Sequence, residues 1–443
     1  MTLESDHVLA DETRWSWLVL IMAACFIAWQ YLQTLVELLL PGALTARFGT
    51  IAAVVMLLAF LFLQTGDLLK SGKLAIPWSF ALAMWAVISA AVTTNFAYLL
   101  ISFYEIVTLG LIYTIFVGLA MHNRSLSIVF KVLVVLAALN AAIALWGVLT
   151  GQTLFNVSRD DVGVGAFGYE ADSGRAGGLR GENYMGMWVA PALAAGLFRM
   201  FRKPYGPLGL TLTGLASIGI IVSNSRTSMV SMVITGLTVM ILVAARGIKV
   251  TRTVVAILGF ALIAYVAVQV IHIESSRFTE QIREQQESRW SGLDSWSESR
   301  LPVWEASLSV SMNNLLFGNG PAANLTMIEL VSHNSFLDML LQYGLIGLLI
   351  FCIPSVFLLH MFVRHFRRVV ADDYLVLLYA CLFGMTFAWL TLSCALMKFI
   401  WIVMALTHGR LLYVQKRAEE EAALAEASTE GEYDPLCQDG LPT

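Results

Sequence analysis

Apolar runs of about twenty residues recur along this chain and constrain its fold more than any other feature. About twelve of them are long enough, or nearly so, to cross the roughly 30 Å hydrocarbon core of a bilayer. Hydrophobic residues make up 58% of the chain and charged residues only 13%, whereas a soluble chain carries about twice that charged fraction. The sequence therefore predicts an all-α polytopic membrane protein with about twelve transmembrane helices.

Basic residues set the expected orientation, because Lys and Arg are retained on the cytoplasmic side of a membrane. Alternate connections between the apolar runs are short and basic, with the sequences HNR, FRMFRKPYG, ARGIKVTR and VRHFRR. The acidic segment 1–14 lacks the basic start and small-residue cleavage site of a signal peptide, so the first helix should remain in the protein. We expect both termini to be cytoplasmic.

The remaining organisation follows from this orientation. Residues 1–14 form a cytoplasmic segment, and residues 15–273 contain the first nine helices, with an extracytoplasmic loop at 150–183. The largest extracytoplasmic loop, 274–333, should carry short helices, one of them capped by Ser299. Residues 334–414 contain the last three helices, and 415–443 form an acidic cytoplasmic tail that we expect to be partly disordered.

His333 and Asn334 stand at the outer boundary of the tenth predicted helix, in what should be its first turn. The N-terminal end of a helix disfavours a protonated imidazole. His333 would then stay neutral and able to accept a proton, as a general base must. The alternative is an interfacial histidine that only caps the helix. Gly344 and Gly347 follow on the same helix and should allow another helix to approach closely.

Arg226 lies in the short outer connection SNSRTSM, on the side of the membrane where arginine is normally avoided. One interpretation is a snorkelling side chain that anchors a helix end. The other is a guanidinium aimed at a phosphate, with which its planar fork makes bidentate contacts. We favour phosphate binding.

These residues resemble the signature of a known family. The pattern of His333-Asn334 followed by Gly344 and Gly347, placed after the largest outer loop, is similar to that of O-antigen ligases and related protein O-oligosaccharyltransferases. The specific similarity covers about residues 175–347. Family members carry a comparable arginine at the position of Arg226. The resemblance implies a GT-C-like glycosyltransferase architecture in the bacterial inner membrane, with the active site facing the periplasm.

The resemblance also suggests further site residues. Arg300, with Trp304 packing beside it, matches the family's second phosphate-binding arginine, although three other arginines of the loop, Arg277, Arg283 and Arg289, compete for this role. Arg289 is the second choice. Arg180 and Asn183 resemble the family's segment before the sixth helix, where the alternative is a flexible loop that closes onto a helix cap.

We expect neither a metal nor another cofactor. Glu170 and Asp172 form an acidic pair of the kind that can hold a divalent cation, but the first outer loop has no carboxylate, and the family is thought to work without metal. No CxxC pair and no GxxxxGK[ST] motif is present.

The expected activity is an inverting transfer of a glycan from a polyprenyl (undecaprenyl) diphosphate carrier to a hydroxyl group. Lipid A-core of lipopolysaccharide is the expected acceptor, which would make the protein an O-antigen ligase. A growing glycan would make it a polysaccharide polymerase, and a protein hydroxyl an O-oligosaccharyltransferase. A transporter or flippase for the lipid-linked glycan is the alternative without catalysis. Membrane lipids are expected partners and nucleic acid is not.

Overall fold

The computed structural model describes residues 17, 20–30, 75–93, 96, 98–150, 168–170, 175–178, 182–202, 206–223, 225–248, 293–328 and 332–430. Two of the roughly twelve apolar runs that the sequence predicts as membrane helices, at 47–65 and 253–273, lie outside the described residues. Five described helices are long and apolar enough to cross a membrane. The prediction of a multi-pass, helical membrane protein is confirmed at this level.

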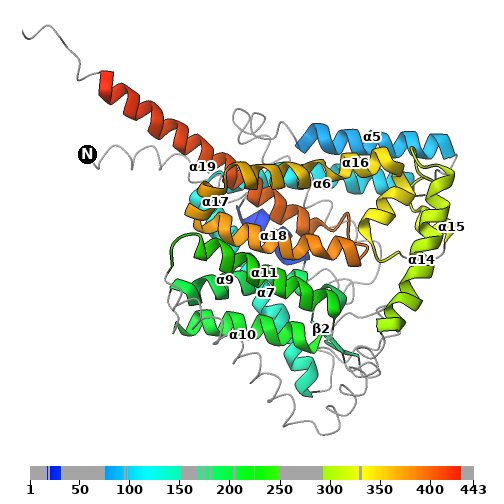
Figure 1. The fold of residues 1–443 in the computed structure, drawn as a ribbon, viewed down its shortest axis with the longest axis horizontal. Coiled ribbons are helices and arrows are strands. Elements are labelled where there is room, and N and C mark those ends of the chain that lie inside the picture. Colours follow the sequence, from blue (N-terminus) through cyan, green and yellow to red (C-terminus); the bar gives the residue numbers. More distant parts are fainter. Residues whose placement is uncertain are drawn as a thin grey trace, which may run out of the picture.

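The five long apolar helices include α6 (Leu99–Ala120), α7 (Asn123–Thr150), α11 (Arg226–Ala244), α16 (Ser335–Arg364) and α18 (Asp373–Thr391). Shorter or more polar helices complete the described bundle: Leu20–Gln30, α5 (Ala75–Thr93), α9 (Met185–Arg202), α10 (Pro207–Val222) and α19 (Lys398–Glu430). In Figure 1 most of these helices run side by side along the long axis of the molecule, and α19 continues past the bundle at the left.

Five smaller elements of the described chain stand between the bundle helices. A short antiparallel pair, β1 (Gly168–Glu170) and β2 (Arg175–Gly178), lies in the connection predicted at 150–183 and is followed by the 3-10 turn η1 (Glu182–Tyr184). The helices α15 (Ala323–Met327) and α17 (Phe366–Ala371) flank α16. The small sheet is an addition to the all-α fold that the sequence predicts.

One further helix, α14 (Leu293–Asn313), comes from the largest predicted outer loop. It runs across the right-hand ends of the bundle helices in Figure 1. The predicted cap at Ser299 is wrong, because the helix already begins at Leu293 and Ser299 lies inside it. The loop does carry helices, but only α15 is short, as predicted, whereas α14 has 21 residues.

An aromatic cluster forms the centre of the core. Trp401 of α19 stacks on Trp78 of α5 with ring centroids 4.6 Å apart. Its ring also lies 6.0 Å from Trp389 of α18 and 5.8 Å from Phe351 of α16. Offset and edge contacts of this kind are the preferred geometry for aromatic pairs. Four helices that are distant in sequence are thereby held together.

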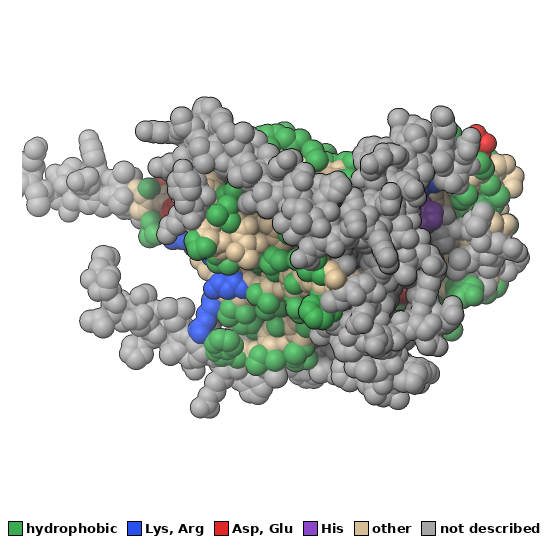
Figure 2. Space-filling model, turned by 90° about the horizontal axis from the view of Figure 1, so that it is seen from below, with side chains coloured by type: hydrophobic (Ala, Val, Ile, Leu, Met, Phe, Trp, Pro, Cys, Tyr) green, Lys and Arg blue, Asp and Glu red, His purple; other side chains and the backbone are tan. Residues whose placement is uncertain are grey.

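The two ends of the bundle differ in chemistry. At one end Arg202 and Arg246 both bind Asp373, and Arg410 binds Asp372, so the ends of α9 and α11 meet the start of α18. We call this the ion-pair end. The starts of α11 and α16 and the last residue of α18, Thr391, lie at the opposite end, which we call the site end. Figure 2 shows basic side chains gathered towards the left of the molecule and a large apolar surface between its ends.

Candidate active site

His333 lies in the turn that precedes α16, one residue further from the helix than the sequence predicts. Asn334 is the N-cap, and its side-chain oxygen accepts hydrogen bonds from the N–H groups of Phe336 and Leu337 at 3.0 and 3.2 Å. Because Asn334 supplies the cap, His333 is not needed for capping. His333 takes a left-handed backbone conformation with φ of 52° and is only partly exposed to solvent. This conformation is uncommon for residues other than glycine and turns the chain sharply before the helix.

Hydrogen bonds fix this turn on both sides of the histidine. The Oγ of the buried Ser332 accepts from the N–H of Asn334 at 3.0 Å and lies 2.8 Å from Oδ1 of Asp338. The indole N–H of Trp304 in α14 donates to the carbonyl oxygen of Ser332 at 2.8 Å. Trp304 therefore connects α14 to the segment that carries His333. The sequence predicts only that Trp304 packs beside Arg300, so this hydrogen bond is a more specific contact.

Arg300 lies on the same helix as Trp304 and reaches the end of α18. Its Nη1 donates to the carbonyl oxygen of Thr391 at 3.0 Å. The hydroxyl of Thr391 is 3.0 Å from that of Thr227, which follows Arg226 in the first turn of α11. The end of α18 thus joins the segments that carry the two predicted phosphate-binding arginines.

The start of α16 is fixed to the same place. The hydroxyl of Ser335 donates to the carbonyl oxygen of Leu392 at 2.7 Å and accepts from the N–H of Cys394 at 2.9 Å. The end of α18 and the turn after it therefore hold α11, α14 and α16 together. Sequence reasoning missed this junction, because it works through main-chain groups and common hydroxyl side chains that form no recognisable motif.

The hydrogen bonds of Arg300, Thr227 and Trp304 bring the three predicted residues to the same end of the bundle, where their charges influence one another. Burial lowers the pKa of Arg300, and the neighbouring positive charge of Arg226 lowers it further. Burial also lowers the pKa of His333, the charge of Arg300 acts in the same direction, and Asp338 opposes both. The imidazole is therefore neutral at pH 7 and can accept a proton. Arg226, Arg300 and His333 form one positively charged cluster at the site end.

Asn183 lies beside the beginning of α11. The hydroxyl of Ser228 donates to the carbonyl oxygen of Asn183 at 3.5 Å, and the N–H of Gly186 donates to that hydroxyl at 2.9 Å. A Cβ on Gly186 would lie 2.5 Å from the Cα of Ser228, so glycine permits the close approach of α9 to α11. Asn183 is thus near the segment of Arg226, whereas Arg180 and Arg289 lie outside the described residues.

The helix that follows His333 is broken at Gly344. This residue has φ of 67° and ψ of −172°, so α16 consists of two helical pieces. Gly318, with φ of 77°, lies against the break, and a Cβ on either glycine would collide with the other segment's backbone. Both positions therefore require glycine. The sequence predicts that Gly344 contacts another helix. In the structure Gly344 instead contacts the loop around Gly318.

Polar groups exposed by the break are bound from two sides. The N–H of Asn319 donates to the carbonyl oxygen of Leu341 at 2.9 Å, and the indole of Trp85 in α5 donates to that of Tyr343 at 2.7 Å. A membrane helix tolerates such a break only where its free backbone groups find partners. Gly347 packs against the Trp85 ring, so this glycine does lie at a contact with another helix.

Metal ligands do not gather in the part of the chain that the structure describes. Within these residues, no group of three or more His, Cys, Asp or Glu side chains could hold a metal ion. Glu170 lies in β1, and Asp172 is outside the described residues. The expectation of a metal-free site stays a prediction.

Fold and site together define a polytopic membrane protein with a cationic, histidine-containing cluster at one end of its bundle. Residues 211–352 match the family model described as O-Antigen ligase. The match confirms the predicted resemblance to the O-antigen ligase family, and the matched segment contains Arg226, Arg300 and His333. A comparison with curated proteins finds no match to the chain.

Proposed function

We propose that this protein transfers a glycan from a polyprenyl diphosphate carrier, undecaprenyl diphosphate in bacteria, to a hydroxyl acceptor. The observation that carries the proposal is the convergence of Arg226, Arg300 and His333 within the segment that matches the O-antigen ligase family. Two guanidinium groups next to a neutral imidazole supply an anion site and a proton acceptor in the same place.

In the proposed reaction, the acceptor oxygen attacks the anomeric carbon of the first sugar. The bond between that carbon and the diphosphate oxygen breaks, and the polyprenyl diphosphate leaves with the bonding electrons. His333 takes the proton of the acceptor hydroxyl. Attack opposite the leaving group inverts the configuration at the anomeric carbon.

Arg226 and Arg300 are assigned to the leaving diphosphate. Negative charge grows on this group as the glycosidic bond breaks, so fixed cations stabilise the transition state more than the ground state. Removal of one such group typically lowers the turnover number by about 10²–10³-fold. Guanidinium groups in this role remove the need for a divalent cation, and we propose that transfer is metal-independent.

The remaining proposals concern acceptor and topology. Lipid A-core is the proposed acceptor, and a growing polysaccharide or a protein hydroxyl are the alternatives within the superfamily. About twelve spans in a GT-C-like arrangement, both termini in the cytoplasm, and a site end facing the periplasm agree with the positive-inside rule. Support for this orientation comes from the basic connections that end α9 and α11, since Arg202 and Arg246 lie together at the ion-pair end.

The decisive experiment is transfer by the purified, reconstituted protein. It uses a lipid-linked glycan, each of the three acceptors in turn, and a chelator. Wild type should form product in the chelator, and His333→Ala should lose about 10²–10⁴-fold in rate, as expected for a missing general base. His365→Ala, a histidine between α16 and α17 at the ion-pair end, is the matched control and should retain activity.

A cell-based measurement separates the transferase from a flippase. In cells that carry Arg226→Ala at normal membrane levels, the unused lipid-linked glycan should accumulate on the periplasmic leaflet. Accumulation on the cytoplasmic leaflet would support a flippase and contradict the transferase. Full transfer by purified His333→Ala would remove the histidine from the mechanism.

A further inference from the structure

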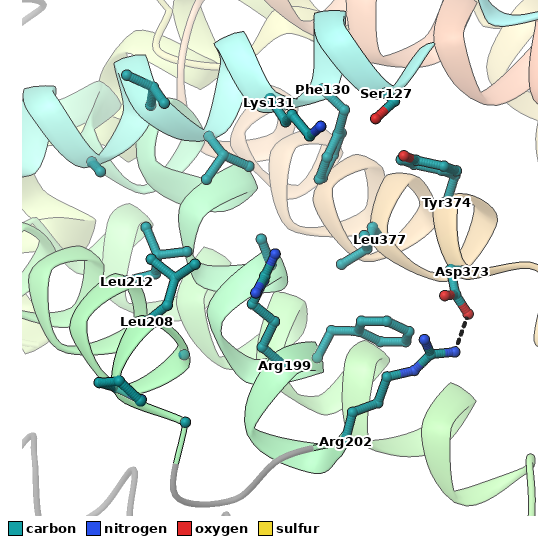
Figure 3. A pocket seen from close by; sticks show the side chains of 18 residues that line it. Ser127, Phe130, Lys131, Arg199, Arg202, Leu208, Leu212, Asp373, Tyr374 and Leu377 are labelled. Atoms are coloured by element: carbon teal, nitrogen blue, oxygen red, sulfur yellow. Dashed lines mark hydrogen bonds and ion pairs between the residues drawn. The ribbon is translucent and has the colours of Figure 1, made fainter. Parts of the chain in front are cut away.

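A cavity of about 920 Å³ lies at the ion-pair end, remote from the cluster of Arg226, Arg300 and His333. Its walls come from α7, α9, α10 and α18, and most of its lining side chains are apolar. Figure 3 shows Leu208 and Leu212 of α10 on one side of the cavity and Tyr374 and Leu377 of α18 on the other. The proposed transferase mechanism makes no use of this space.

Basic side chains reach into the cavity from two helices. In Figure 3 Arg199 of α9 extends towards Lys131 of α7 across the open space. Within the described part of the chain, no carboxylate forms an ion pair with either of them. The one acidic residue of the lining, Asp373, is bound by Arg202 and by Arg246 at 2.6 Å each. The polar part of the cavity therefore attracts an anion.

Exposed apolar side chains form part of the cavity wall, and we expect them to face hydrocarbon in a membrane-spanning bundle. Val135 and Leu208 both line the cavity, and they are 64% and 50% exposed. Exposed apolar side chains on a membrane-spanning bundle lie against lipid tails. Ala138 lies seven residues beyond Lys131 on α7, so the apolar part extends about 10 Å further along the helix than the Cα of Lys131. A water-soluble anion would gain nothing from these apolar walls.

We propose that this cavity binds an anionic phospholipid. Its phosphate lies between Lys131 and Arg199, and one acyl chain fills the apolar space that reaches Ala138. This occupant satisfies both parts of the cavity, because it carries a negative charge and an apolar chain in one molecule. The site also explains Lys131, a charged residue within a membrane helix, a position that is costly without a function. The proposal does not depend on the transferase activity.

The test is native mass spectrometry of the full-length protein in detergent. The protein is titrated with phosphatidylglycerol and, separately, with phosphatidylcholine that has the same acyl chains. Wild type should bind phosphatidylglycerol more tightly. Each basic residue near a membrane surface contributes about fivefold to binding of an anionic lipid. Lys131→Gln and Arg199→Gln should each weaken phosphatidylglycerol binding by that factor, and the double variant should show no preference between the two lipids.

Two variants control for charge and for shape. Arg367→Gln removes an exposed charge outside the cavity lining, and it should leave the lipid preference unchanged. Ala138→Trp fills the apolar part of the cavity and should weaken the binding of both lipids. Equal binding of both lipids by wild type, or an unchanged preference in the double variant, would overturn the proposal and leave Lys131 as a snorkelling residue. Displacement of the lipid by inorganic phosphate would show a soluble anion site instead.

Discussion

The two ends of the bundle use arginine differently. At the ion-pair end Arg410 binds Asp372 through Nε and Nη2, and the pair is 8% and 14% exposed. At the site end Arg300 donates to a main-chain carbonyl and lies near Arg226, whose positive charge repels its own. A cation bound to a carboxylate is neutralised and holds helices together, whereas adjacent cations create a field that attracts an anion. The comparison separates arginines that stabilise the fold from arginines that we propose bind the substrate.

The largest expected effect tests this separation directly. Arg300→Ala should lower the rate of glycan transfer by about 10²–10³-fold, because a cation beside the leaving diphosphate is lost. Arg202→Ala removes the same type of side chain from the ion-pair end and should change the rate by less than about twofold, since its ion pair is largely exposed. The measurement is turnover by equal amounts of folded, reconstituted protein. Similar losses in both variants would abolish the distinction between the ends.

The reverse effect is expected for stability. Arg410→Ala leaves the largely buried carboxylate of Asp372 without its ion-pair partner, and removal of one member of such a pair costs about 3 kcal/mol. Asp372 also caps α18 by accepting from the N–H of Leu375 at 2.9 Å, so the start of this helix should loosen. Thermal unfolding in detergent should show the loss for Arg410→Ala and a small change for Arg300→Ala. An equal loss in both variants would mean that Arg300 is structural.

A smaller effect is expected at the contact that positions His333. Trp304→Phe keeps an aromatic ring but removes the hydrogen bond to the carbonyl of Ser332. A hydrogen bond of this kind contributes about 1 kcal/mol, so transfer should fall by about fivefold with little change in substrate affinity. Trp401→Phe removes the corresponding bond to Ala395 in the core and should affect thermal unfolding more than turnover. A loss of binding in Trp304→Phe would instead place this residue in contact with the substrate.

The sequence alone predicted several parts of this arrangement. The apolar runs at 98–121 and 374–391 located α6 and α18 to within a few residues, because a membrane helix must be apolar over its whole length. His333 and Arg226 could be picked out from the sequence because each is an ionisable residue beside the start of a membrane helix, where a buried charge is costly. The structure brings both close to Arg300.

Other parts depend on tertiary contacts and could not be predicted. The last residue of α18 and the turn after it bind Arg300, Thr227 and Ser335 through carbonyl and hydroxyl groups that every chain contains in abundance. The break at Gly344 requires the loop around Gly318 to lie against it, a contact that neither segment specifies by itself. Ser299 favoured a cap by local propensity, yet α14 begins at Leu293, because such a preference is weaker than tertiary packing.

The smallest expected effect concerns the pH dependence of transfer. Burial and the charge of Arg300 hold the pKa of His333 below 6.5, so the rate should be constant near neutrality and fall only in acid, where the base becomes protonated. Arg300→Ala removes a lowering charge and should move this acid limb to higher pH. Asp338→Asn removes the opposing charge and should move it to lower pH. Opposite shifts, each under about one pH unit, would identify His333 as the titrating base, and shifts in the same direction would exclude it.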